Sequence, residues 1–361
     1  MKPRNIAIAC GVAGVAVGLA AATGIVYHKQ IKSAASLKRL TDYADGYDLY
    51  AIDIAYDYDL DRIIAADVRD DQTYIDAVVA QVLPGVPAHV QAPQFACSAF
   101  AAVDAEGRVR TGRNYDFKDD TSALLVRNHP RDGYASIGFA ALNNLGANAP
   151  LDSIAGRAAS LMGPFAQLDG VNECGVSIAV LTLDSKPCDQ DTQRPVINTS
   201  LAIRLVLDRA ATTQEAVDLL SAYDMHAMAG RDYHFFINDA TGDARVVEWD
   251  PRDPDRAFKA TPVRQVTNFY ACYGDEVLPN QKNGELGHGK ERATAIADVL
   301  DTHAGAQDET AAWKALRAAA QEPNPEDITS NTQWSVVFDN TEPAAAITLR
   351  RHWGDVDAFA L

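Results

Sequence analysis

A cysteine at the start of a predicted hairpin is the feature that most constrains this chain. The stretch ACSAFAAVDAEGRVRTGRNYDF begins at Ala96 and contains Cys97, a strand, a turn at 104–107 and a second strand. A hairpin of this length returns the chain alongside its own start, so we expect Arg113 and Asp116 beside the cysteine. A neighbouring guanidinium favours the reactive thiolate by lowering the thiol pKa from its free value of about 8.5. The pattern is typical of an activated thiol.

From these residues alone, two interpretations of Cys97 remain. One is a nucleophile activated by Arg113. The other is a structural cysteine followed by an Arg and an Asp at the end of the next strand, because a buried free cysteine usually behaves as a small hydrophobe. The remaining motifs bear on this choice.

Three further segments accompany the hairpin. DGVNECGVSIAVLTL covers 169–183, QVTNFY covers 265–270 and GKERATAI covers 289–296. With the hairpin, and in the same order, they resemble the choloylglycine hydrolase family, the linear amide C–N hydrolases that include penicillin V acylases and bile salt hydrolases. That family belongs to the N-terminal nucleophile hydrolases. The resemblance covers roughly the last 265 residues, from Cys97 onward.

The resemblance implies that a cysteine becomes residue one of the mature chain and that its own α-amino group serves as the base. An α-amino group has a pKa of about 7.7 to 8.0, which is close to the value that a general base needs at neutral pH. Carried onto this sequence, Cys97 is the nucleophile, Arg113 stabilises its thiolate and Asp116 orients the α-amine.

The resemblance also implies an oxyanion hole and a second arginine. Asn268 in QVTNFY would donate to the oxyanion, and Arg292 would support the cluster electrostatically. Thr182 stands where the family usually has Asn or Tyr, so its hydroxyl or a backbone N–H would serve there. From the residues alone, Asn268 could instead satisfy backbone groups at a strand end. Arg292 could equally be an exposed helical arginine.

The order of strands and helices from Cys97 onward predicts an α+β fold, in which sheets are covered by helices. Thr212 with Glu215 three residues later has the capping-box pattern of a helix start. The resemblance implies a four-layer αββα sandwich. The expected strands are 100–103, 109–114, 122–126, 176–183, 233–239, 244–250, 333–339 and 344–353, and the expected helices are 198–211, one beginning at 212, 292–303 and 310–320.

The amino-terminal region predicts export. Lys2 and Arg4 precede an uncharged stretch of 22 residues, Ile6 to Tyr27, and basic residues follow it. A bilayer crossing takes about 20 residues, so a cleaved signal peptide and an uncleaved membrane anchor are both compatible, and the flanking lysines favour the anchor as translated. We expect a leader at 1–32, and the protein would be held at the cell membrane or secreted.

Residues 33–96 read as an acidic, tyrosine-bearing prosegment, with a helical stretch near 73–83. Pro84, Pro87 and Pro93 favour an extended linker that ends close to Cys97. If Cys97 needs a free amine, this whole region is a propeptide. The alternative is a permanent amino-terminal subdomain, in which case the α-amine mechanism fails. The catalytic domain is expected at 97–361.

Composition excludes several classes of function. A formal net charge of −17 argues against nucleic acid binding, which requires a basic face. The cysteines show no zinc spacing and the eight His residues form no HExxH motif, so we expect no metal and no cofactor. In an exported protein, two of Cys174, Cys188 and Cys272 could form a disulfide, and buried thiols are the alternative. Cys10 lies in the leader.

The sequence thus predicts an exported amidohydrolase that cleaves a linear N-acyl amide, such as penicillin V, a conjugated bile salt or an N-acyl amino acid, through a thioester on Cys97. Acyl transfer of the isopenicillin N acyltransferase type is the nearest alternative, because LVLDRAATTQEAVDLL and HFFINDATGDARVVEWD resemble that branch. A noncatalytic surface-binding protein on the same fold is a third. Only 23 residues separate Asn268 from Arg292. Bile salt hydrolases have an extension there that builds their tetramer, so we expect no tetramer of that type.

Overall fold

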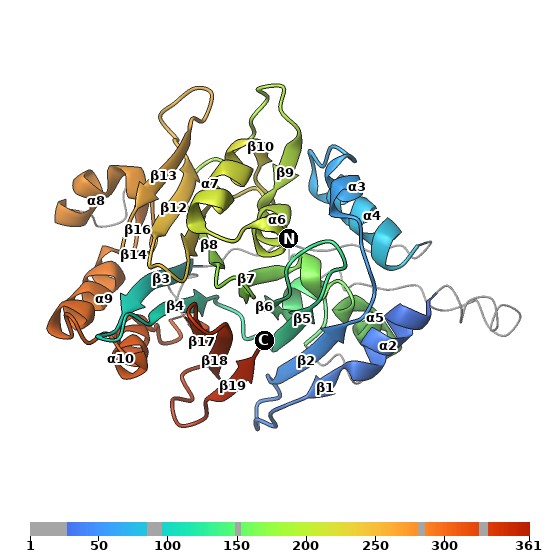
Figure 1. Ribbon diagram of the computed structural model, residues 1–361, viewed down its shortest axis with the longest axis horizontal. Coiled ribbons are helices and arrows are strands. Elements are labelled where there is room, and N and C mark those ends of the chain that lie inside the picture. The colour runs from blue at the N-terminus through green and yellow to red at the C-terminus, as the bar shows by residue number, and fades with distance from the viewer. Residues whose placement is uncertain (1–26, 85–95, 149–152, 281–285, 325–330) are drawn as a thin grey trace, which may run out of the picture.

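Two antiparallel-rich sheets stacked face to face form the centre of the molecule (Figure 1). The computed structural model describes residues 27–84, 96–148, 153–280, 286–324 and 331–361. In sheet order, the nine-stranded sheet contains β1 (Lys38–Arg39), β2 (Leu49–Ile54), β5 (Ala123–Asn128), β6 (Ser136–Ala141), β7 (Gln167–Asn172), β8 (Ser177–Leu183), β11 (Asp232–Asn238), β12 (Ala244–Trp249) and β13 (Phe258–Pro262). The six-stranded sheet contains β14 (Gln265–Val266), β3 (Ala96–Val103), β4 (Val109–Asp116), β17 (Thr332–Asp339), β18 (Ala344–Leu349) and β19 (Asp357–Ala360).

Helices cover the outer face of each sheet. The nine-stranded sheet packs against α6 (Thr199–Arg209) and α7 (Thr213–Ser221), and the six-stranded sheet packs against α9 (Lys290–Thr302) and α10 (Glu309–Ala319). The layers therefore run helix, sheet, sheet, helix. The smaller elements are α2 (His28–Ser36), α3 (Leu60–Ile64), α4 (Asp71–Val82), α5 (Ile154–Ser160), β9 (Val196–Asn198), β10 (Asp224–His226), β15 (Asn268–Phe269), α8 (Gly274–Asn280) and β16 (Gly287–His288).

The period of two along a strand decides which side chains face the centre. In β3, Cys97 and Ala99 point into the core between the two sheets. Phe100 and Ala102 point the other way, into a separate core formed with α9 and α10. Phe100 has room only because the residue opposite it is Gly112, where an added Cβ would lie 2.2 Å from the Phe100 ring. The sequence therefore places the Cys97 side chain between the sheets.

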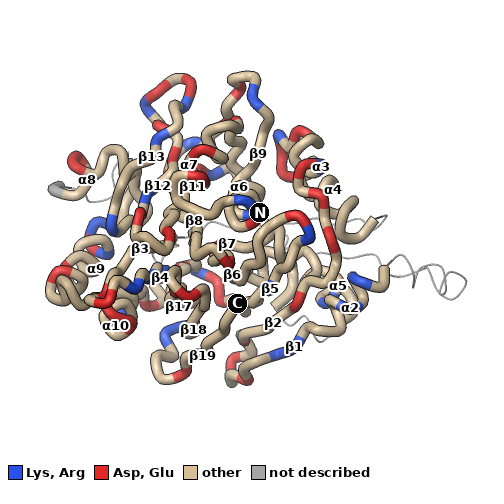
Figure 2. Tube along the Cα trace, viewed as in Figure 1, with Lys and Arg blue, Asp and Glu red and all other residues tan. Residues whose placement is uncertain are grey.

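The segment before Cys97 is part of this fold. Strand β2 pairs in parallel with β5, from Leu49 opposite Ala123 to Ile54 opposite Asn128. Together with β1, it forms one edge of the nine-stranded sheet. Acidic residues lie at the starts of α3 and α4, with Asp59 and Asp61 at α3 and Asp70 and Asp71 at α4 (Figure 2). Residues 33–84 thus contribute both strands and helices to the same body that holds Cys97.

The expected elements agree closely with those observed. The α+β class and the four-layer arrangement are confirmed, and the hairpin of β11 and β12 turns at Asp239 to Gly242 as predicted. Thr212 accepts a hydrogen bond from the backbone nitrogen of Glu215, as a capping box requires, although the Glu215 carboxylate accepts from Ala211 rather than from Thr212. Several strands and helices extend beyond their expected bounds by one to a few residues, and the strand expected over 344–353 ends at Leu349.

Two sequence expectations concern the leader and the cysteines. The apolar stretch from Ile6 lies outside the described residues apart from Tyr27 at its end. Within the part of the chain that the structure describes, no helix is long and apolar enough to cross a membrane. Cys174, Cys188 and Cys272 are all free thiols in the structure, so no disulfide joins them. The alternative, buried thiols, holds for Cys188, whereas Cys174 and Cys272 are only partly buried.

Candidate active site

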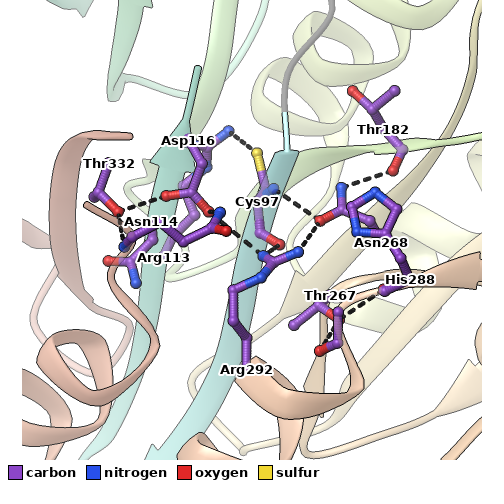
Figure 3. Close-up of polar contacts among 12 residues, drawn as sticks. Cys97, Arg113, Asn114, Asp116, Thr182, Thr267, Asn268, His288, Arg292 and Thr332 are labelled. Atoms are coloured by element: carbon purple, nitrogen blue, oxygen red, sulfur yellow. Dashed lines mark hydrogen bonds and ion pairs between the residues drawn. The ribbon is translucent and has the colours of Figure 1, made fainter. Parts of the chain in front are cut away.

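Cys97 lies at the second position of β3, between the two sheets, and is fully buried. Its sulfur accepts a hydrogen bond from Nη2 of Arg113 at 3.3 Å. Its backbone nitrogen donates to Oδ1 of Asn268 at 3.0 Å, and its carbonyl oxygen accepts from Nη1 of Arg292 at 2.6 Å (Figure 3). Three of the predicted site residues therefore contact the nucleophile directly, each at a different atom.

The guanidinium of Arg113 is itself buried and held from several sides. Its Nε lies 3.0 Å from Oδ2 of Asp169, and Nη2 also donates to the carbonyl of Val180 at 3.2 Å. The rings of Tyr115 and Trp334 lie 5.0 Å and 5.6 Å from its carbon Cζ, within the range of cation–π attraction. These contacts hold the arginine on the inter-sheet face, where its guanidinium contacts the Cys97 sulfur.

Asp169 is a member of the site to which the sequence assigned no role. It accepts from Nε1 of Trp334 at 3.1 Å and from the backbone nitrogen of Phe139 at 3.2 Å, besides its ion pair with Arg113. Burial raises the pKa of the Asp169 carboxyl, and the Arg113 charge opposes that rise. The available signal was an acidic residue inside the apolar strand QLDGVN, at a position whose neighbours are buried.

Burial and the Arg113 charge act in opposite directions on the pKa of the Cys97 thiol. Burial raises its pKa to about 12, and the lowering effect of Arg113 is smaller than this cost. The Arg113 charge acts in the expected direction, toward a lower thiol pKa, but burial outweighs it. Removing a thiolate from water is unfavourable, and a single neighbouring charge does not compensate for full burial here.

Asn268 and Arg292 form one hydrogen-bonded unit around the Cys97 backbone. Nη2 of Arg292 donates to Oδ1 of Asn268 at 2.7 Å, and Nδ2 of Asn268 donates to the carbonyl of Thr182 at 2.7 Å. Oδ1 of Asn268 accepts from two donors and Nδ2 donates to one acceptor, and these contacts define the orientation of the amide. Since an amide nitrogen carries two hydrogens, one hydrogen of Asn268 remains for another acceptor.

Thr182 reaches the site through its backbone rather than its side chain. Its carbonyl accepts from Asn268, while its hydroxyl is buried and has no hydrogen-bond partner among the described residues. Figure 3 shows the side chain on the far side of this carbonyl from Asn268. The structure therefore brings Thr182 to the cluster, but it does not place the hydroxyl where the oxyanion expectation needed it.

Asp116 lies on the opposite face of β4 from Arg113. Its carboxylate accepts from Oγ1 of Thr332 at 2.6 Å and from Nε2 of Gln321 at 2.9 Å, and it pairs with Nη1 of Arg292 at 3.4 Å. Burial raises its pKa, with Arg292 opposing. The Cys97 nitrogen donates to Asn268, and the Asp116 carboxylate connects to the Cys97 carbonyl oxygen through Arg292. Thr332 and Gln321 carried no sequence signal.

Gly289 allows Arg292 to enter the site. It is the N-cap of α9 and has a φ of +95°, a conformation that L side chains rarely adopt. An added Cβ would lie 2.7 Å from Nη2 of Arg292 and 2.5 Å from Oγ1 of Thr267. The Gly-Lys-Glu-Arg start of this helix therefore brings the arginine to the strand carrying Asn268.

The arrangement suits acyl transfer to sulfur. It combines a thiol, a buried cation at the sulfur and an amide donor beside the backbone of Cys97. Within the described residues, no group of three or more His, Cys, Asp or Glu side chains could hold a metal ion.

A cysteine near the start of a strand, between two stacked sheets that are covered by helices, defines the N-terminal nucleophile class of fold. A family model described as acyl-coenzyme A:6-aminopenicillanic acid acyl-transferase matches residues 103–352, so the chain belongs to this family. No curated protein matches the chain.

Solved structures share the fold at low sequence identity. Penicillin V acylase from Agrobacterium tumefaciens is 19% identical with a TM-score of 0.53, over 73% of this chain and 86% of that chain. A mutant conjugated bile acid hydrolase from Clostridium perfringens is 15% identical with a TM-score of 0.57, over 73% of this chain and 92% of that chain. The resemblance recognised in the sequence is thereby confirmed.

Proposed function

We propose that this protein is an amidohydrolase that cleaves a linear N-acyl amide through a thioester on Cys97. The observation that carries the proposal is the convergence on one residue of Arg113 at the sulfur, Asn268 at the nitrogen and Arg292 at the carbonyl oxygen. The two structural relatives, named as penicillin V acylase and conjugated bile acid hydrolase, support this reaction type. Fold alone does not determine function, so the site carries the argument.

The proposed reaction requires cleavage of the bond between Ala96 and Cys97. The nitrogen of Cys97 is an amide in the uncleaved chain, and its delocalised lone pair cannot accept a proton from the thiol. Hydrolysis of this bond releases an α-amine with a pKa of about 7.7 to 8.0. Asn268 is already positioned to accept a hydrogen bond from that nitrogen. The nucleophile and its base then belong to the same residue.

In the acylation step, the α-amine takes the thiol proton and the sulfur attacks the carbonyl carbon of the substrate. Arg113 stabilises the negative charge on sulfur at 3.3 Å. The remaining hydrogen of Asn268 Nδ2 donates to the oxyanion. The protonated α-amine gives its proton to the leaving amine, and the C–N bond breaks. Water then attacks the thioester with the same amine as base, which releases the carboxylic acid and restores the thiol.

Substrate candidates follow from the same chemistry. Penicillin V, glycine-conjugated bile salts and long-chain N-acyl amino acids are all linear N-acyl amides, and no cofactor takes part in their cleavage. The acidic composition, −17 in formal charge, makes nucleic acid an unsuitable partner. The short stretch between Asn268 and Arg292 argues against assembly of the bile salt hydrolase tetramer. The apolar stretch from Ile6 to Tyr27 supports export, with the catalytic region outside the cytoplasm.

A second candidate activity is acyl transfer to an amine. The family model, which is described as an acyl-coenzyme A:6-aminopenicillanic acid acyl-transferase, favours it. Both reactions pass through the same thioester and differ only in whether water or an amine attacks it. Hydrolysis without an added amine identifies the hydrolase, whereas product formation that requires an amine acceptor identifies the transferase. A passive binding protein would show neither activity and no fast-reacting thiol at Cys97.

The decisive experiment measures release of free amine from the three substrate classes by the purified protein, after its amino terminus is established by sequencing and intact mass. Cys97→Ser should reduce turnover at least about a hundredfold, because a hydroxyl is hardly ionised at neutral pH. Cys174→Ala is the matched control and should retain parental turnover. Parental turnover by processed Cys97→Ser protein, or full activity in a chain still carrying Ala96, would contradict the proposal.

A further inference from the structure

A buried His–Glu pair lies behind the strand that carries Asn268. His234 on β11 and Glu248 on β12 are both fully buried. Nδ1 of His234 lies 3.2 Å from Oε2 of Glu248, and Nε2 lies 3.0 Å from the carbonyl oxygen of Thr267. Thr267 directly precedes Asn268. The proposed mechanism assigns no role to either member of this pair.

Glu248 binds the other end of the same segment. Its Oε2 accepts from the backbone nitrogen of Ala271 at 3.0 Å, and its Oε1 accepts from the backbone nitrogen of Cys272 at 2.6 Å. The pair therefore contacts the chain immediately before Asn268 and again three and four residues after it. A buried carboxylate and a buried imidazole are costly unless hydrogen-bonded. Among the described residues, their hydrogen-bond partners are each other and this one segment.

We propose that His234 and Glu248 are positioning residues for Asn268, and that they act as one hydrogen-bonded pair sharing a single proton. The carbonyl of Thr267 can only accept, so Nε2 of His234 must carry a hydrogen. A second proton must then lie between Nδ1 and Oε2, because otherwise a lone pair on the imidazole would face a carboxylate. The hydrogen bonds on the two sides of the imidazole ring therefore require one hydrogen on Nε2 and one between Nδ1 and Oε2.

The surroundings of the pair are consistent with this proton count. Among the neighbouring titratable groups, the Cys272 thiol hydrogen-bonds to Glu248. Burial is the largest cause that raises the pKa of this thiol, so the thiol keeps its proton and donates it to Glu248. Two residues before His234, Asp232 is occupied by Arg256 and Tyr270. Asp250 pairs with Lys259 and accepts a hydrogen bond from the Tyr273 hydroxyl.

The role of the pair rests on the proposed function of Asn268, which needs its amide held against the Cys97 backbone. Displacing a catalytic donor by about 1 Å costs about a hundredfold in rate. Loss of the His234 contact to Thr267 would free the carbonyl just before Asn268 and allow such a displacement. The effect should appear in kcat, since an oxyanion donor acts in the transition state rather than in substrate binding.

Two variants of His234 separate the two ring contacts. In His234→Gln, the side-chain amide reaches the place of Nε2 and can still donate to Thr267. In His234→Asn, the shorter amide reaches only the place of Nδ1, so Thr267 loses its donor. We expect His234→Asn to lower kcat about tenfold to a hundredfold with an unchanged KM, and His234→Gln to lower it less. His226→Gln, in the partly exposed pair with Asp189, is the matched control and should match the parent.

A double-mutant cycle and an activity-independent measurement complete the test. His234→Asn combined with Asn268→Ala should be no slower than Asn268→Ala alone, because both changes affect the same donor. In uncleaved Cys97→Ala protein, nitrogen NMR should show a hydrogen on Nε2 of His234 and a proton in the hydrogen bond between Nδ1 and Glu248. His234→Asn should shift the Asn268 side-chain amide signals, and His226→Gln should leave them unchanged.

Additive kcat losses, a His234 Nε2 without a hydrogen or unmoved Asn268 signals would overturn the positioning role. These outcomes differ from failure of the proposed function, which would show as no amine release or acyl transfer by the parent enzyme. The NMR readouts need no turnover, so they test the pair even in that case.

Discussion

The backbone nitrogen of Cys97 donates to the side-chain oxygen of Asn268 across 171 residues of sequence. The same oxygen accepts from Arg292, so it is occupied by donors on two sides. Cleavage before Cys97 would convert the nitrogen from an amide into an amine without moving its acceptor. The acceptor for that amine would therefore be in place before cleavage.

Thr182 offers the sharpest test of how the oxyanion is held. Because its carbonyl orients Asn268 and its hydroxyl has no partner among the described residues, Thr182→Val should keep kcat within about twofold of the parent. Loss of a true oxyanion donor costs about 10²- to 10³-fold in kcat. A loss of that size in a folded Thr182→Val protein would assign the donor role to the hydroxyl. Steady-state kinetics of amine release distinguish the two outcomes.

The segment before Cys97 should stay bound after the chain is cut. Leu49 and Ile52 of β2 are fully buried in the sheet, and Tyr74 of α4 donates to the carbonyl of Phe165 at 2.6 Å. We expect both fragments to elute together from size-exclusion chromatography and to separate only in denaturant.

A matched pair of variants on β2 tests this expectation. Ile52→Asp, which buries a charge, should release the fragment or prevent folding, whereas Asp53→Asn at the neighbouring exposed position should do neither. An active enzyme that has lost residues 27–84 under native conditions would show that the segment is dispensable.

The Arg113–Asp169 ion pair should matter for stability as well as for catalysis. Both side chains are fully buried, so Asp169→Asn leaves an arginine charge without its partner. Breaking such a pair costs about 3 to 5 kcal/mol of unfolding free energy. Urea unfolding of the variant measures this loss. Asp132→Asn removes the exposed partner of Arg131 and should leave the midpoint unchanged, and equal effects of the two variants would refute the assignment.

The reactivity of Cys97 should depend on cleavage and on pH. Burial raises its pKa in the uncleaved chain to about 12, above the free value, so the folded state favours the neutral thiol. That contribution to stability is complete below the free pKa of about 8.5 and is lost as pH rises toward about 12. At pH 8, iodoacetamide should label Cys97 in cleaved chains but not in uncleaved ones.

Intact mass reports cleavage and labelling on the same molecule, so the two populations need not be separated. Denatured protein provides the fully labelled control. Rapid labelling of folded, uncleaved chains at pH 8 would show that the thiol is more ionised than its burial indicates.

Local patterns predicted the elements of the fold well, because alternation and capping depend on neighbouring residues. The hairpin from Ala96 to Asp116 and the start of α7 at Thr212 are examples. The parallel pairing of β2 with β5 could not be predicted, since it joins segments separated by a long stretch of chain. This pairing places β1 and β2, which lie within the expected prosegment, at one edge of the main sheet.

For the site, motif resemblance placed five residues within one network: Cys97, Arg113, Asp116, Asn268 and Arg292. What it could not give was the face on which each side chain lies. The register of β4 against β3 places Arg113 beside the Cys97 sulfur. It places Asp116 on the opposite face of β4, where its carboxylate pairs with Arg292. Gln321 and Thr332 joined the site through tertiary packing, for which sequence spacing provides no signal.

The pairing of β2 with β5 has a consequence for how the protein would behave once cut. In the intact chain, the two strands meet at the high local concentration set by their covalent connection. After cleavage, the same ladder would join two separate polypeptides, and its formation would become a bimolecular step. The midpoint of unfolding would then rise with protein concentration. The chain would therefore fold as a monomer, but after cleavage it would lose stability on dilution, as a heterodimer does.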